Sequence, residues 1–228
     1  KIKYFFMIEI AIDGPAASGK GALGKKLSDK YNFPYLDTGI LYRKVAYELI
    51  KNNIKNSENI EILCCNFAKN LNLKELKNKN LRTEDVAKLA SKIAIFPNLR
   101  KILNNKQKEF SNFNKKQFGG CILDGRDIGT TILPNADFKF FITASIEVRA
   151  KRRLLQKNIS FLHENDEKCM LQTLINDMTE RDRLDSNRKT SPLVPAKDAH
   201  VIDTTIINSQ ELLLVVINII EGKNELLK

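Results

Sequence analysis

A short apolar segment that runs into a glycine-rich loop constrains the fold of this chain more than any other feature. Residues 8–22 read IEIAIDGPAASGKGA, which predicts a buried strand, a loop and the start of a helix. Residues 14–20 match the phosphate-loop pattern G-x-x-x-x-G-K, in which backbone N–H groups and a lysine surround a phosphate. A strand and helix joined by incidental glycines is the alternative, but a position directly after a strand is typical of a phosphate loop. We expect the phosphate contacts to come from Gly14, Pro15, Ala16, Ala17, Ser18, Gly19, Lys20, Gly21 and Ala22.

The two residues after the lysine depart from the strict pattern. In the strict form a Ser or Thr directly follows the lysine, and its hydroxyl helps to hold magnesium. Here Gly21 and Ala22 follow Lys20. Because backbone N–H groups and Lys20 do most of the phosphate binding, we expect nucleotide binding to be retained. The missing hydroxyl should affect magnesium, which would rest on nucleotide oxygens, on water and, through water, on Asp124.

Short apolar segments alternate with helical patterns along the chain. The strands are expected at residues 8–12, 121–123, 138–142 and 200–202. The helices are expected at residues 19–31, 40–51, 83–94, 97–110, 146–156, 166–183 and 209–222. This alternation predicts a three-layer α/β/α fold, in which helices cover both faces of a parallel sheet.

Two regions interrupt the alternation. Residues 52–82 are rich in Asn and Lys and have weak periodicity, and residues 156–192 form a polar helical segment between two strands. We interpret both as lobes inserted at the carboxyl edge of the sheet, where open α/β sheets bind ligands. A chain of 228 residues is long enough for one domain with such lobes. We therefore expect a single domain over residues 1–228.

The charge balance predicts an anionic partner but does not choose among several. There are 38 Lys and Arg residues against 27 Asp and Glu, a net charge of +11. Nucleic acid, an acidic membrane and a small phosphorylated substrate would all fit. Most lysines are scattered among asparagines and are interpreted as solvated surface. The arginines gather in VRAKRR and ERDRLDSNR, and guanidinium groups suit bidentate contacts with phosphate.

The cysteines and the apolar start of the chain bear on its location. With no C-x-x-C pair and only two histidines, a zinc site is not expected. We expect free thiols in a reducing cytoplasm at Cys64, Cys65, Cys121 and Cys169.

The opening KIKYFFMIEIAI is apolar after a basic start, as in a signal peptide. Cleavage of a signal peptide at this point would destroy the phosphate loop, so we interpret the segment as a short leader and the first strand. No other apolar run approaches the roughly 20 residues that span a bilayer, so no membrane partner is expected.

A second phosphate site is indicated about twenty residues after the loop. The segment YLDTGILYR places Asp37, Thr38, Tyr42 and Arg43 at the start of a helix. Thr38 or Asp37 could simply cap that helix. Beside a phosphate loop, however, a hydroxyl at a helix amino end and an arginine one turn later favour phosphate binding.

Two later segments carry acids and arginines. In CILDGRDIGT, Asp124 follows a strand in the position of an acid that holds magnesium or its waters, and Arg126 and Asp127 are expected in the same cleft. An ordinary Asp-Gly turn is the alternative. In ERDRLDSNR, Arg181, Asp185 and Arg188 recur at near-helical spacing, which also suits structural salt bridges along one helix face.

Five segments in order, IDGPAASGKG, YLDTGILYR, FPNLR, LDGRDIGT and RLDSNRKTSPL, resemble those of bacterial cytidylate kinases over nearly the whole chain. The resemblance implies a P-loop kinase fold with a monophosphate-binding lobe at about residues 38–115 and a lid at about 156–192. It implies transfer of the γ-phosphoryl group of ATP to CMP or dCMP, with Mg²⁺. A cytoplasmic monomer without a stable nucleic-acid partner is expected.

The resemblance also implies roles for individual residues. The acceptor phosphate would be held by Thr38, Arg43, Arg126 and Arg188, and the cytosine would be recognised by Ser91, Arg100 and Asp127. Arg181 and Asp185 would contact the sugar, and the catalytic charges would be Lys20, Arg126, Arg181 and Arg188. A carboxylate at residue 127 suits the cytosine amino group, and uracil would offer it no donor.

Other functions stay open on the sequence. One is a P-loop kinase for UMP, AMP or a phosphorylated metabolite, and another is a basic nucleic-acid-binding protein that retains the loop as a relic. Nucleoside monophosphate kinases usually have Gly and then Thr after the lysine of the loop, so this chain departs from them at Ala22. It also departs from many relatives in the lid segment KNISFLHENDEKCM, which has few arginines. These departures bear on the rate more than on the reaction.

Overall fold

The computed structural model describes residues 7–54, 59–156, 163–188 and 190–225. The predicted leader at residues 1–6 and parts of the predicted lid lie outside the described residues. The chain divides into two compact units. We call Lys1–Tyr35 with Asn114–Lys228 the core unit, and Leu36–Phe113 the helical unit.

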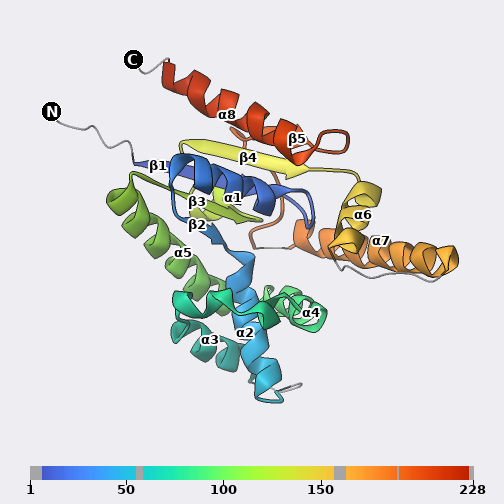
Figure 1. The fold of residues 1–228 in the computed structure, drawn as a ribbon. Helices are drawn as coiled ribbons and strands as arrows, with labels where there is room; N and C mark the ends of the chain where they lie inside the picture. Colours follow the sequence, from blue (N-terminus) through green and yellow to red (C-terminus); the bar gives the residue numbers. More distant parts are fainter. Residues whose placement is uncertain (1–6, 55–58, 157–162, 189, 226–228) are drawn as a thin grey trace. The chain divides into compact units, whose positions relative to one another are not determined.

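The core unit is built on a sheet whose strand order is β2-β3-β1-β4-β5 (Figure 1). The strands are β1 (Ile8–Asp13), β2 (Tyr35–Asp37), β3 (Gly120–Gly125), β4 (Phe138–Thr143) and β5 (His200–Asp203). β1 pairs in parallel with β3 and β4, and β4 pairs in parallel with β5. The central place of β1 explains why Ile10, Ala11 and Ile12 are all apolar and fully buried, because a strand covered on both faces is not amphipathic.

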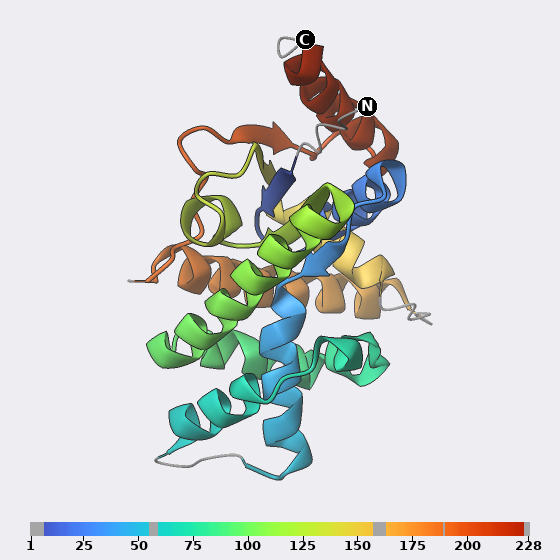
Figure 2. The same ribbon diagram turned by 90° about the vertical axis from the view of Figure 1, so that its left-hand side faces the viewer.

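Helices α1 (Lys20–Tyr31) and α8 (Ser209–Glu225) pack together over the sheet (Figure 2). Their apolar side chains join the strands in one buried cluster: Ile10, Ile12, Leu23, Leu27, Ile122, Phe138, Phe140, Ile142, Leu212, Val216 and Ile220. This burial fixes α1, and therefore the loop that leads into it, against the carboxyl edge of the sheet.

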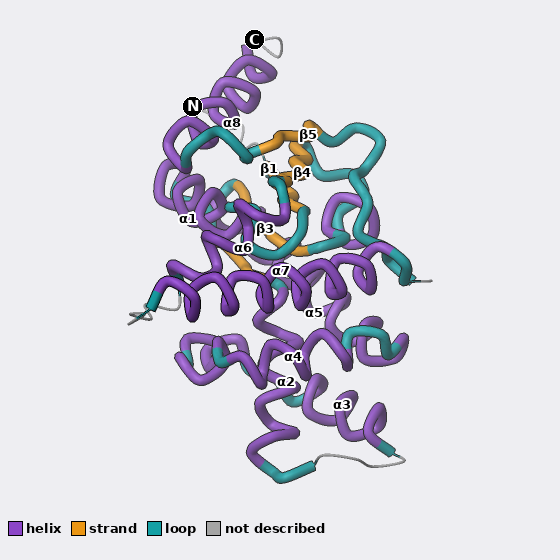
Figure 3. The backbone as a smooth tube through the Cα atoms, turned by 90° about the vertical axis from the view of Figure 1, so that its right-hand side faces the viewer, coloured by secondary structure: helices purple, strands orange, loops and turns teal. Residues whose placement is uncertain are grey.

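A second pair of helices, α6 (Ile146–Leu155) and α7 (Glu164–Ser186), lies side by side in the core unit (Figure 3). Ala150 and Leu154 of α6 pack against Leu174 and Met178 of α7. Two residues of the predicted phosphate loop, Ala16 and Ala17, pack against the same cluster. The helix pair is thereby attached directly to the loop.

The helical unit contains α2 (Gly39–Lys51), α3 (Ile60–Lys69), α4 (Glu84–Ile93) and most of α5 (Pro97–Phe118). Short 3₁₀ helices cover Leu73–Lys77 and Lys79–Arg82. α2 packs against both α3 and α4. It is the centre of this unit, with Ile40, Leu41, Val45, Ala46 and Leu49 buried along it.

The predicted α/β fold, a parallel sheet flanked by helices, is confirmed, and all four predicted strands are present. Three elements differ from the prediction. The short strand β2 was not expected, α3 lies in the weakly periodic region 52–82 where no helix was assigned, and α5 extends beyond residue 110 to Phe118. The four cysteines are free thiols. Across the described residues, no helix is long and apolar enough to cross a membrane.

Candidate active site

The phosphate loop follows β1 as predicted, and its backbone requires glycine. Gly14 has φ +147°, and a Cβ there would lie 2.0 Å from the backbone oxygen of Ile142. Gly19, the N-cap residue of α1, has φ +101°, and Ala17 also has a positive φ of 58°. No acidic residue stands in the first turn of α1. The amino end of this helix therefore presents backbone N–H groups and a positive dipole to an anion.

Inside the loop, two side chains suit a phosphate. Lys20 Nζ donates a hydrogen bond to the backbone oxygen of Pro15 at 3.2 Å, so the amine lies over the loop. Among the described residues, the hydroxyl of Ser18 is buried without a hydrogen-bond partner. A buried unpaired hydroxyl is costly unless a ligand satisfies it. The loop thus combines a cation, a buried donor and oriented N–H groups.

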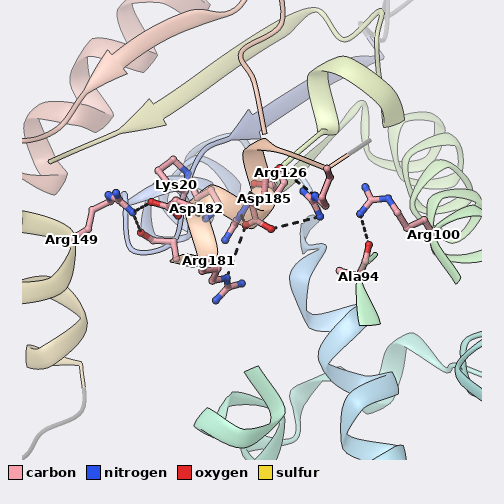
Figure 4. A network of polar contacts seen from close by, with 12 residues as sticks. Lys20, Ala94, Arg100, Arg126, Arg149, Arg181, Asp182 and Asp185 are labelled. Atoms are coloured by element: carbon pink, nitrogen blue, oxygen red, sulfur yellow. Dashed lines mark hydrogen bonds and ion pairs between the residues drawn. The ribbon is translucent and has the colours of Figure 1, made fainter. Parts of the chain in front are cut away.

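Two arginines of α6 stabilise the loop through hydrogen bonds to its backbone oxygens, directly or through Thr204. The sequence motifs did not assign them this role. Arg149 NH1 donates to the Ala16 oxygen at 3.4 Å and pairs with Asp182 of α7 at 2.7 Å (Figure 4). Arg152 donates to the Thr204 hydroxyl at 2.9 Å, and that hydroxyl donates to the Ser18 oxygen at 3.0 Å. The cluster VRAKRR therefore binds loop carbonyls and α7 in this structure.

Three arginines surround Asp185 at the carboxyl end of α7, and Figure 4 shows Arg126 and Arg181 among them. Arg126 Nε lies 2.9 Å from Asp185 Oδ2, Arg188 NH1 3.7 Å from Oδ1, and Arg181 Nε 4.0 Å from Oδ2. Burial alone would raise the pKa of Asp185, but the three guanidinium groups lower it below its ordinary value. The three guanidinium groups that meet here suit contacts with a phosphate.

Asp13, which ends β1, is a buried acid that no motif singles out. Its two oxygens accept hydrogen bonds from the backbone N–H groups of Ile128 and Gly129, at 2.8 and 2.7 Å. These residues open a π-helical turn, Ile128–Ile132, whose N-cap residue is the buried Asp127. Burial raises the pKa of Asp13 to about 6 despite these bonds. The sequence feature that could have identified Asp13 is a charged residue at the end of an apolar strand.

Asp124 lies buried at the end of β3 and accepts a hydrogen bond from the hydroxyl of Tyr35 at 2.7 Å. Among the described residues, no three His, Cys, Asp or Glu side chains are grouped to hold a metal. Mg²⁺ commonly uses one or two carboxylates and takes its remaining ligands from phosphate and water. Asp124 lies in the strand that pairs with β1, and its carboxylate fits that mode.

The remaining predicted residues lie in the helical unit. Thr38 is the N-cap residue of α2, and Ser91 is part of α4. Arg43 donates to the Leu81 oxygen at 3.2 Å. The buried Arg100 donates to the Ala94 oxygen at 3.2 Å (Figure 4).

Asp37 has a partner that the sequence did not predict. Its carboxylate lies 3.2 Å from Arg82, at the end of a 3₁₀ helix. Of the predicted residues, the core unit brings Arg126, Arg181, Asp185 and Arg188 into direct contact.

The chain is similar to several known proteins. The family model described as cytidylate kinase matches residues 10–222. Cytidylate kinase from Bartonella tribocorum is 42% identical over 86% of each chain, and the one from Paramagnetospirillum magneticum is 40% identical over 94% of this chain and 98% of that protein. The crystal structure of an uncharacterized protein from Eubacterium ventriosum has the same fold, with a TM-score of 0.50 at 17% identity over 94% of this chain and 98% of that one. The chain belongs to the cytidylate kinase family.

Proposed function

We propose that the protein transfers the γ-phosphoryl group of ATP to CMP or dCMP, which gives ADP and CDP or dCDP. The observation that carries this proposal is the register of β1 against β3, where Asp13 pairs with Gly125. The next residues are Gly14, which opens the phosphate loop, and Arg126 of the arginine cluster. A site for donor phosphates and a cationic cluster thus begin at neighbouring positions of one sheet edge.

The donor would bind at the phosphate loop. The backbone N–H groups of residues 14 and 16–22 and the amine of Lys20 would surround the β- and γ-phosphates of ATP, and Ser18 would gain the partner that its buried hydroxyl requires. When Mg²⁺ is bound with ATP, it supplies positive charge between the phosphate oxygens. Asp124 would hold it through water.

Within each unit, the residues proposed for the acceptor are given the roles that the family implies. In the core unit, Arg126 and Arg188 would hold the monophosphate, Asp127 the cytosine amino group, and Arg181 and Asp185 the sugar. In the helical unit, Thr38 and Arg43 are assigned to the phosphate and Ser91 and Arg100 to the cytosine, and Asp37 is assigned to the substrate site without a particular contact.

The reaction needs no protein nucleophile. An oxygen of the acceptor phosphate attacks the γ-phosphorus, the bond from that phosphorus to the β-γ bridging oxygen breaks, and ADP leaves with the bond electrons. Two anions must be held in line against their mutual repulsion. Lys20 and the arginines supply the charge that offsets this repulsion, so catalysis is positioning and electrostatic stabilisation.

Substitution of the cluster arginines tests the acceptor site. Arg126→Ala and Arg188→Ala should each lower kcat/KM for CMP at least about tenfold, since a hydrogen bond to a charged group contributes about 1.5–3 kcal/mol. Arg183→Ala is the matched control, because Arg183 lies near Asp185 on α7 but is exposed and pairs with Glu180. If both cluster variants kept the kcat/KM of the control, the acceptor phosphate would bind elsewhere.

We further propose that the enzyme acts on small nucleotides as a cytoplasmic monomer without a stable nucleic-acid partner. Its charge of +11 would also suit a nucleic-acid-binding protein. Nucleic-acid binding weakens steeply with salt, whereas a kinase consumes ATP only with the right monophosphate. Light scattering after size exclusion would give the oligomeric state.

A further inference from the structure

Tyr35, at the start of β2, lies against the first turns of α1. Its hydroxyl donates to Asp124 Oδ2 at 2.7 Å. Its ring occupies space that Gly24 leaves open, since a Cβ on Gly24 would lie 2.4 Å from the ring atom Cε2. The absence of a side chain at residue 24 therefore allows this ring to reach Asp124.

The same hydroxyl lies where the phosphate loop lacks one. A Cβ on Gly21 would lie 3.4 Å from Asp124 Oδ2 and 3.6 Å from the Tyr35 hydroxyl. Residue 21 directly follows Lys20, which is the position of the Ser or Thr in the strict pattern. A serine at this position would place its hydroxyl beside the oxygen atoms that Tyr35 and Asp124 bring together.

We propose that Tyr35 is a positioning residue that takes the place of the missing loop hydroxyl. Its phenol fixes the Asp124 carboxylate for the water shell of Mg²⁺ bound with a nucleoside triphosphate. The inference rests on the proposed function only in that ATP is the donor, and it assigns no contact with the acceptor.

Binding of the non-hydrolysable analogue AMP-PNP tests this role without turnover. Calorimetry would give its Kd with Mg²⁺ and with EDTA, and the ratio of the two reports how far the metal strengthens binding. Tyr35→Phe keeps the ring and removes the hydroxyl, so the ratio should fall about five- to tenfold while Kd in EDTA changes less than about twofold. Tyr31→Phe is the control, because its exposed hydroxyl faces Glu221 at 3.5 Å. The control should behave as the unaltered protein.

A rescue separates this role from loop packing. In the Tyr35→Phe background, Gly21→Ser should restore the Mg²⁺ ratio to within about twofold, whereas Gly21→Ala should not. An unchanged ratio in Tyr35→Phe would overturn the proposal, as would an equal loss of affinity with Mg²⁺ and with EDTA. Because no acceptor is present, a failure of the CMP assignment would leave these binding results unaffected.

Discussion

Two buried carboxylates of the core unit, Asp13 and Asp185, have pKa values shifted in opposite directions. For both, burial raises the pKa. Asp13 is opposed chiefly by two backbone N–H groups, and its pKa rises to about 6. Asp185 is opposed by three guanidinium groups, which lower its pKa. Local charge, and not burial, therefore decides that Asp185 remains ionised beside the proposed acceptor site.

Asp185→Asn should lower the free energy of unfolding by about 3 kcal/mol at pH 7, because it leaves three close cations without their carboxylate. A lowered pKa contributes stability above the ordinary value of 3.8, and this contribution is lost as the pH falls through the folded-state value. The gap between the two proteins should therefore begin to narrow as the pH falls below about 4, and it should close only below the folded-state pKa of Asp185. Urea unfolding at pH 7 and pH 3 measures it, with the exposed Asp29→Asn as control. A gap that is equal at both pH values would contradict the ion-pair account.

At the scale of the element, the phosphate loop and the strand before it could be predicted, because the loop backbone requires glycine at particular positions and these glycines are visible in the sequence. The lone short strand β2 could not be predicted in this way, since three residues carry no periodicity. Helix α5 continues past the predicted end because Ser111 and Asn114 are buried. Tertiary packing there overrides the weak helix propensity of Ser and Asn. Helix α3 was missed because it buries only Cys64 and Ala68, too few residues for a clear apolar stripe.

Two glycine substitutions should have opposite effects. Gly14→Ala should lower the free energy of unfolding by at least about 3 kcal/mol and abolish ATP binding, because its Cβ would meet the Ile142 oxygen at 2.0 Å and φ is +147°. Gly222→Ala, in α8 with nothing within 4 Å of the added Cβ, should raise stability by up to about 1 kcal/mol. Thermal unfolding with and without ATP measures both. Normal ATP binding by Gly14→Ala would contradict the assigned loop geometry.

At the scale of the whole molecule, the motifs of the sequence are divided between two units. Lys20, Arg126 and Asp185 belong to the core unit, and Thr38 and Arg100 to the helical unit. The sequence could predict the residue types of the site because phosphate requires cations and N–H groups at fixed spacings. It could not predict the partners, such as Arg82 for Asp37 or Tyr35 for Asp124, because these pairs form only when separate elements fold together.

The most direct test of the central claim is an assay that couples ADP formation to NADH oxidation, with ATP, Mg²⁺ and one acceptor at a time. CMP and dCMP should be phosphorylated with kcat/KM at least about tenfold above UMP and AMP, since uracil offers no donor to Asp127 and loses a buried hydrogen bond. Equal turnover of UMP and CMP would contradict the assignment of cytosine recognition to Ser91, Arg100 and Asp127. No ADP formation with any of the four would contradict the proposed reaction itself.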